Sequence, residues 1–117
     1  MFLGLQVVRY YLGQQFQAHY DWFADDYKMK IHNQRQYTIF GYLNDCTEGG
    51  ETAFPKLNHS FSPRRGDALF WRDSADINTP LMESFHAGMP PTGNTSVKYG
   101  LNIWYNFLPL IDEKYYD

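Results

Sequence analysis

Short apolar runs, broken by turn residues, dominate this chain, and most of them alternate between apolar and polar positions. A period of two is typical of β-strands, whose side chains point alternately to the two faces of a sheet. The pattern predicts strands over residues 5–12, 19–23, 36–43, 52–54, 68–72 and 96–107. No stretch shows convincing helical periodicity. The sequence therefore predicts an all-β fold, arranged as a sandwich or barrel-like sheet.

The segments between these strands are rich in glycine, proline and charge, and are predicted to be turns, loops and connectors (24–36, 48–51, 56–63, 65–67 and 73–81). Residues 24–36 are polar with weak helical periodicity, so we expect a loop beside the functional site with one helical turn at most. Such a loop could act as a lid.

The strand predicted over 96–107 presents two different faces. One face carries Lys98, Gly100, Asn102 and Trp104, and the other carries Tyr99, Leu101, Ile103 and Tyr105. A lysine on the inner face is costly unless it is paired. On a solvated face it would extend its ammonium group into water. Local periodicity is compatible with either face being the inner one.

A length of 117 residues leaves room for a single domain over 1–117 with one core. The net charge of −3 and the lack of a basic stripe give no indication of nucleic-acid binding. No apolar run approaches the roughly 20 residues that span a bilayer. The N-terminus resembles a strand more than a signal peptide. Cys46 is the single cysteine, which excludes a disulfide within the chain.

The candidate chemistry starts from His19 and Asp21, which are separated by one residue and so share a face of an extended segment. His86, arriving from another strand, would complete two imidazoles and one carboxylate. This ligand set with open positions is typical of non-heme Fe(II) oxygenases, and it also suits zinc. His32 and His59 lie in polar loops and are expected to be exposed. No catalytic residue beyond the metal ligands is predicted.

Lys98 is the candidate cation for an acidic co-substrate, because it could hold a carboxylate far from the metal. Arg65 and Arg72 are its rivals, since a guanidinium group binds carboxylate in a bidentate manner. Tyr10 and Thr38 could add hydroxyl donors near that carboxylate, or they could be ordinary packed strand residues.

Aromatic residues follow the first ligand pair directly. Trp22 and Tyr27 could line a groove for an extended or polyproline II peptide, or they could cap the core. They are the candidate substrate-binding residues.

Four segments, in this order, resemble the prolyl 4-hydroxylase group of 2-oxoglutarate- and Fe(II)-dependent dioxygenases. They are VRYYLGQQFQAHYD (8–21), YLNDCTEGGETAFP (42–55), PRRGDALF (63–70) and SFHAGMP (84–90). The resemblance runs from residue 5 to 107. It implies a double-stranded β-helix, or jelly-roll barrel, that here lacks the N-terminal portion of typical members. An exposed apolar face and an unpaired sheet edge are then expected.

The resemblance also implies roles for named residues. His19, Asp21 and His86 would bind Fe(II), Lys98 would hold the distal carboxylate of 2-oxoglutarate, and the Tyr10 and Thr38 hydroxyls would assist.

The expected activity is O2-dependent hydroxylation of peptidyl proline, with succinate and CO2 as co-products and ascorbate as the usual reductant. The alternatives are the same chemistry on another protein residue or a small molecule, or a non-catalytic truncated jelly-roll module. The resemblance makes the endoplasmic reticulum a possible compartment.

Overall fold

The computed structural model describes residues 2–28, 33–93 and 97–107, with side chains from Leu5 onward. Within these residues nearly all regular structure is β. One four-stranded antiparallel sheet has the order β1-β12-β3-β7, with bounds Phe2–Tyr11, Val97–Asn106, Arg35–Tyr42 and Ala68–Arg72. The other has the order β2-β10-β5-β6, with bounds Phe16–His19, His86–Gly88, Thr52–Phe54 and His59–Phe61.

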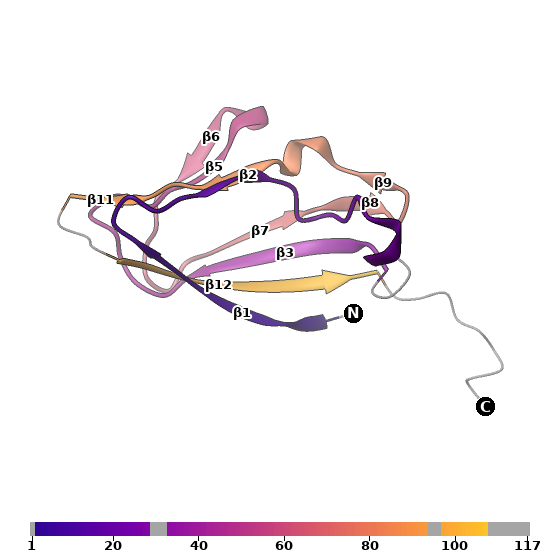
Figure 1. Cartoon of the computed structure of the whole chain (residues 1–117), viewed down its shortest axis with the longest axis horizontal. Coiled ribbons are helices and arrows are strands. Elements are labelled where there is room, and N and C mark those ends of the chain that lie inside the picture. Colours follow the sequence, from indigo (N-terminus) through magenta and orange to yellow (C-terminus); the bar gives the residue numbers. More distant parts are fainter. Residues whose placement is uncertain (1, 29–32, 94–96, 108–117) are drawn as a thin grey trace.

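The two sheets lie face to face as two layers, with β1, β12, β3 and β7 below and β2, β5 and β6 above in Figure 1. Short elements complete the described chain: β4 and β11, β8 and β9, and two 3₁₀ turns. Their bounds are Glu48–Gly49, Pro91–Thr92, Ser74–Asp76, Thr79–Pro80, Pro55–Leu57 (η1) and Met82–Ser84 (η2). Because the chain crosses repeatedly between the two sheets, the fold is the predicted all-β jelly roll.

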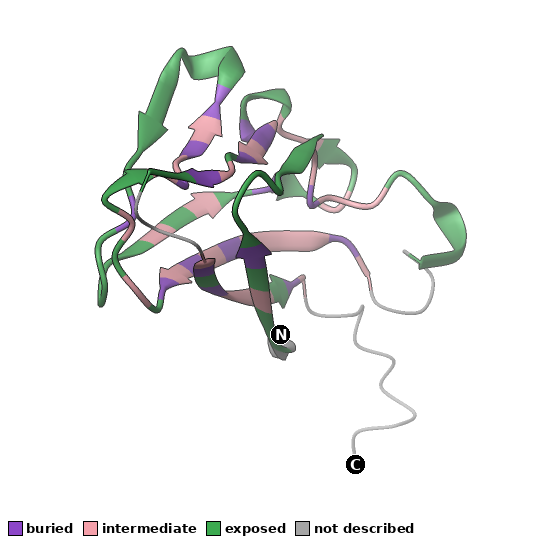
Figure 2. Cartoon of the chain, turned by 60° about the vertical axis from the view of Figure 1, so that its left-hand side comes forward, coloured by how far each residue is buried: buried purple, intermediate pink, exposed green. Residues whose placement is uncertain are grey.

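The space between the sheets holds the core. Its buried apolar side chains are Tyr10, Phe40, Tyr42 and Phe54, and Figure 2 shows burial concentrated where the two layers face each other. Gly100 on β12 makes room for Phe40 on β3, because a Cβ at Gly100 would overlap the Phe40 ring. The inner face of β12 is the face that carries Lys98, whose side chain is fully buried.

The outer face of the β1-β12-β3-β7 sheet is largely apolar and exposed. Cross-strand pairing places Leu5, Ile103, Ile39 and Phe70 in one row across all four strands. Leu5 and Phe70 at the ends of the row are each 62 % exposed. In the described part of the chain β1 pairs with β12 alone, so the sheet has an open edge there. Both the exposed apolar face and the unpaired edge match the expectation.

The strands predicted at 5–12, 36–43, 52–54, 68–72 and 96–107 are present within one to three residues of their predicted ends. Four segments differ from prediction, and one of them is the expected turn 48–51, which contains β4. β2 covers Phe16–His19 and ends at the first ligand, so 19–23 is not a strand; the expected loop 56–63 contains η1 and β6; and the connector 73–81 contains the β8-β9 ladder. β6 is an exposed edge strand, and without a buried face it leaves no alternating apolar pattern to detect. Within the expected loop 24–36, residues 26–28 are helical, β3 begins at Arg35, and 29–32 lie outside the described residues.

Candidate metal centre and co-substrate cavity

Three potential ligands converge at the end of the β2-β10 ladder. The antiparallel register pairs His19 directly with His86, and Asp21 follows two residues after His19. One ligand atom from each of the three side chains lies within 4.8 Å of the others. The Nε2 atoms of His19 and His86 are 3.3 Å and 3.6 Å from Oδ1 of Asp21. The arrangement offers two nitrogens and one oxygen around a single point.

Backbone carbonyls orient both imidazoles. Nδ1 of His19 is 2.7 Å from the Gln17 carbonyl oxygen, and Nδ1 of His86 is 2.7 Å from that of Ser84. With Nδ1 donating to a carbonyl, Nε2 keeps its lone pair toward Asp21, which is the usual way a protein prepares a histidine ligand. Burial lowers the pKa of His86, so this ring is neutral and able to bind a metal at neutral pH.

The two oxygens of Asp21 have different surroundings. Oδ1 faces the histidines, whereas Oδ2 accepts a hydrogen bond from Thr38 Oγ1 at 2.8 Å and from Trp104 Nε1 at 3.4 Å. Burial disfavours the charged form, but the surrounding His19, His86 and Thr38 outweigh it and lower the pKa of Asp21 to about 2. The same contact with Asp21 outweighs burial at His19 and raises the pKa of that ring. Asp21 is therefore an ionised carboxylate at neutral pH.

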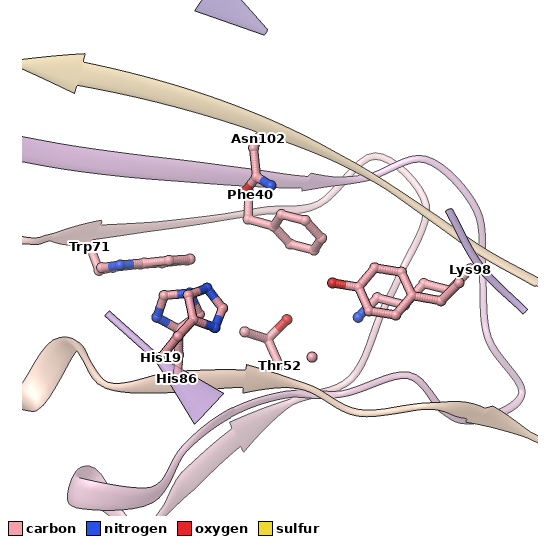
Figure 3. A pocket seen from close by; sticks show the side chains of 9 residues that line it. His19, Phe40, Thr52, Trp71, His86, Lys98 and Asn102 are labelled. Carbon is pink, nitrogen blue, oxygen red and sulfur yellow. The ribbon is translucent and has the colours of Figure 1, made fainter. Parts of the chain in front are cut away.

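A cavity between the sheets extends from His19 and His86 to Lys98. Figure 3 shows the two histidines on one side of it and the Lys98 ammonium group directed into it from the other. The lining residues are Tyr10, His19, Phe40, Thr52, Trp71, His86, Gly88, Lys98 and Asn102. Gly88 keeps the cavity open beside Tyr10, because a Cβ there would lie 2.8 Å from the Tyr10 hydroxyl.

Lys98 is a buried cation surrounded by rings. Its side chain is 0 % exposed, and its Nζ has no hydrogen-bond partner among the described residues. The rings of Tyr10, Phe40 and Tyr42 lie 4.9, 5.4 and 5.8 Å from Nζ. Burial lowers the pKa of Lys98 to about 8. A buried ammonium group without a partner fits an anionic group entering the cavity from the metal side.

Of the other candidate residues that the structure describes, Tyr10 lines the cavity and the rest do not. The Tyr10 hydroxyl lies in the cavity beside Lys98, whereas Thr38 contacts Asp21 and the buried Asp73 and does not line the cavity. Arg65 and Arg72 are exposed, as is His59, and none of them lines the cavity. His32 lies outside the described residues. Lys98 is therefore the cation that the structure brings to the cavity.

Trp22 and Tyr27 lie in different environments. The Trp22 ring packs at 4.6 Å against Tyr20, whose ring in turn lies 4.9 Å from Phe85. Tyr27 is 70 % exposed. Tyr20, Trp22 and Phe85, each a neighbour in sequence of a metal ligand, form an aromatic surface beside the site.

The sequence analysis did not identify several residues of the site. Trp71 lines the cavity, and its ring lies 4.8 Å from that of His86. Trp104 Nε1 lies 3.4 Å from Oδ2 of Asp21. Thr52 and Gly88 face each other across the β5-β10 ladder at the cavity wall. The spacing of two between His86 and Gly88 could have indicated that they share a face.

Comparison with known proteins decides the family. The model of the 2OG-Fe(II) oxygenase superfamily matches residues 5–106. The chain belongs to this superfamily. Among curated relatives, probable prolyl 4-hydroxylase 3 of Arabidopsis thaliana is 40% identical over 107 residues, which cover 74% of this chain and 37% of the relative. A putative prolyl 4-hydroxylase of Acanthamoeba polyphaga mimivirus is 38% identical, covering 86% and 43%.

A solved structure shares the fold of this superfamily member. The viral collagen prolyl hydroxylase of Paramecium Bursaria Chlorella virus-1, in its 2OG complex, superposes with a TM-score of 0.76 at 34% identity. The match covers 89% of this chain and 57% of the viral protein. The chain spans less than half the length of the Arabidopsis thaliana and mimivirus relatives. None of the helices in the described ranges is long and apolar enough to cross a membrane.

The residues present fit the superfamily's Fe(II) and 2-oxoglutarate. The ligand set of two histidines and a carboxylate suits Fe(II) as well as zinc. A zinc ion would leave the unpartnered ammonium group of Lys98 without a role. An acidic co-substrate that spans the cavity gives it a partner.

Proposed function

We propose that this chain forms the catalytic core, over residues 1–117, of a 2-oxoglutarate- and Fe(II)-dependent dioxygenase that hydroxylates peptidyl proline. The observation that carries the proposal is one cavity with the His19-Asp21-His86 ligand set at one side and the unpartnered Lys98 at the other. The prolyl hydroxylase relatives support proline as the target. Succinate and CO2 are the expected co-products.

In this proposal each residue binds, orients or excludes water. His19, Asp21 and His86 hold the iron through Nε2, Oδ1 and Nε2, and Lys98 binds the distal carboxylate of 2-oxoglutarate. The Tyr10 hydroxyl is a second donor beside that carboxylate; burial, with a smaller contribution from Asp21, raises its pKa to about 12, so it keeps its proton. When bound, iron and 2-oxoglutarate supply the O2-dependent oxidation of a substrate C–H bond.

The walls of the cavity are largely apolar. Phe40 and Trp71 contribute aromatic rings to its lining. Excluding water strengthens the charged contacts inside and suppresses side reactions. Ascorbate remains the expected reductant from the family.

The proposal is tested in two steps. The protein is first mixed anaerobically with Fe(II) and 2-oxoglutarate, and O2 and a proline-rich peptide are then added. We expect a visible charge-transfer absorption before O2 is added, then release of succinate and a gain of one oxygen atom on proline, detected by mass spectrometry. Absence of both the absorption and succinate would make the chain a non-catalytic jelly-roll module. Succinate release only with other substrates would retain the chemistry and reject proline.

The affinity for 2-oxoglutarate is expected to depend on pH through Lys98. Below a pKa of about 8 the ammonium group is charged and binds the carboxylate. Above it the free protein loses this proton, so binding becomes weaker by up to about tenfold per pH unit. Titration calorimetry with the Co(II)-loaded protein between pH 6.5 and 9.5 measures this. A Lys98→Met variant should lose the dependence; an equally steep decline in that variant would assign it to another group.

We place the residues that flank the target proline on the aromatic surface formed by Tyr20, Trp22 and Phe85. Lys56 Nζ donates to the Tyr20 hydroxyl at 2.7 Å and adds a fixed positive charge. Aromatic faces of this kind suit proline rings of a polyproline II peptide.

The Trp22→Ala variant should therefore raise the peptide KM about tenfold, the effect of losing one strong aromatic anchor, with 2-oxoglutarate affinity unchanged. Phe70→Ala, which removes an exposed ring from the outer sheet face, is the matched control. Tyr27→Ala tests the other candidate in the same assay. An unchanged peptide KM in Trp22→Ala would remove this surface from the proposal.

A further inference from the structure

Asp73 is a buried acid that the proposed function does not use. It follows β7 directly and is 0 % exposed. Its backbone is fixed on both sides, since its N–H donates to the Gln36 carbonyl at 2.8 Å and its carbonyl accepts from Leu81 N–H at 2.9 Å. These two bonds hold the backbone of Asp73 in place between Gln36 and Leu81.

Two side chains bind the Asp73 carboxyl group, and each also touches the metal centre. Trp71 Nε1 donates to Oδ1 at 2.9 Å, and the Trp71 ring lies 4.8 Å from His86. Thr38 Oγ1 lies 2.6 Å from Oδ2, and the same Oγ1 lies 2.8 Å from Oδ2 of Asp21. Asp73 is thus connected to two of the three ligands, each through one intervening residue.

The hydrogens at Thr38 do not suffice for two ionised carboxylates. A hydroxyl group carries one hydrogen and can donate it once. At 2.6 Å and 2.8 Å both contacts are hydrogen-bond distances, so without a further hydrogen one carboxylate oxygen would lie this close to a lone pair of Oγ1; the longer 3.4 Å contact of Trp104 Nε1 with Oδ2 of Asp21 does not supply a hydrogen between the two oxygens. One further hydrogen is required, and it must lie between Asp73 and Thr38 or between Asp21 and Thr38. Asp21, which faces two histidines, is the poorer site for it.

We propose that Asp73 carries this hydrogen as a neutral carboxyl group and acts as a positioning residue: it donates to Thr38, which directs the Thr38 hydrogen to Oδ2 of Asp21. Oδ1 of Asp21 is then left for the metal. The inference rests on the proposed role of Asp21 as a ligand.

The charges around Asp73 agree with this assignment. Burial, followed by the negative charge of Asp21, raises the pKa of Asp73 to about 7. Arg35 acts in the opposite direction but is the weakest of the influences. Its guanidinium group lies over the Trp104 ring at 4.1 Å and donates to the backbone carbonyl of Asp21 at 3.2 Å. The hydrogen count at Thr38 is the same whatever occupies the metal site.

The experiment measures Co(II) affinity by titration calorimetry and the Co(II) visible spectrum. Asp73→Asn should keep both close to those of the parent, because an asparagine NH2 donates to Thr38 while its oxygen accepts from Trp71. Asp73→Leu and Thr38→Val remove the chain of donors and should weaken Co(II) binding roughly 10- to 100-fold, the usual effect of losing a group that orients a ligand. Thr38→Ser, which keeps the hydroxyl, should restore binding. Asp76→Leu, at an exposed acid, is the control.

Difference infrared spectroscopy of the folded proteins at pH 6 provides a readout that does not depend on metal affinity. The parent should show the C=O stretch of a buried protonated carboxyl group, and Asp73→Asn should lack it. The proposal is overturned if this band is absent, or if Asp73→Asn loses Co(II) as strongly as Thr38→Val, since Asp73 would then act as an ionised acceptor. If the parent itself bound no Co(II), the proposed function would fail, while the infrared band would still report on Asp73.

Discussion

The His86→Ala variant is expected to lose iron binding altogether under conditions in which the parent binds Fe(II) stoichiometrically. His86 is 6 % exposed, its Nδ1 is oriented by the Ser84 carbonyl, and its Nε2 faces Asp21. Removing it leaves one imidazole and one carboxylate. The loss should exceed the 10- to 100-fold decrease in metal affinity that follows when only an orienting group is removed.

Anaerobic titration with Fe(II), followed by calorimetry and a chelator competition, measures this loss. His59→Ala is the matched control, because His59 is an exposed histidine on β6 whose ring packs on Phe61. His86 also packs against Trp71 and Phe54, so a His86→Leu variant that retains bulk should be examined with it. Wild-type Fe(II) affinity in a folded His86→Leu protein would show that the metal is bound elsewhere.

The second large effect is expected at Lys98, where alanine should weaken 2-oxoglutarate binding roughly 10- to 100-fold and leave Fe(II) binding nearly intact. This range corresponds to losing a charged hydrogen bond worth about 1.5–3 kcal/mol. The cause is local, because Lys98 is the buried cation of the cavity and stands apart from the metal ligands. Titration of the Co(II)-loaded variant with 2-oxoglutarate gives the affinity directly.

Removing the charge of Lys98 should stabilise the ligand-free protein, although it weakens 2-oxoglutarate binding. A pKa of about 8 instead of 10.5 means that the buried ammonium group costs roughly 3 kcal/mol at neutral pH. Lys98→Met, which fills the same space without charge, should therefore raise the melting temperature of the ligand-free protein while it lowers 2-oxoglutarate affinity. Arg65→Ala and Arg72→Ala are the controls. An unchanged affinity in Lys98→Ala, with a loss in either arginine variant, would reassign the carboxylate site.

The sequence predicted those parts of the fold and site that depend on periodicity. The spacing of two between His19 and Asp21 predicted that their side chains share a face; β2 ends at His19, but the bend that follows still brings the two side chains together. The alternation along β12 correctly grouped Lys98 with Asn102. These features depend only on the alternation of side chains within one strand, which follows directly from the order of its residues.

The remaining features depend on which strands lie together in space. The inner face of β12 is the face opposite the β2-β10 ladder, and the sequence does not show which strands lie opposite each other. Thr38 was expected beside the co-substrate carboxylate, but β3 places it between Asp21 and Asp73. Asp73 itself lies in a stretch that reads as an ordinary polar connector. Its burial follows from contacts with β3 and the β8-β9 ladder, which no local pattern encodes.

The buried charge of Lys98 also has a consequence for how long the protein survives. A ligand that neutralises this charge stabilises the folded state in proportion to the logarithm of its concentration. Proteases that attack transiently opened chains respond to that stability. Proteolysis of the purified protein should therefore slow when 2-oxoglutarate is added.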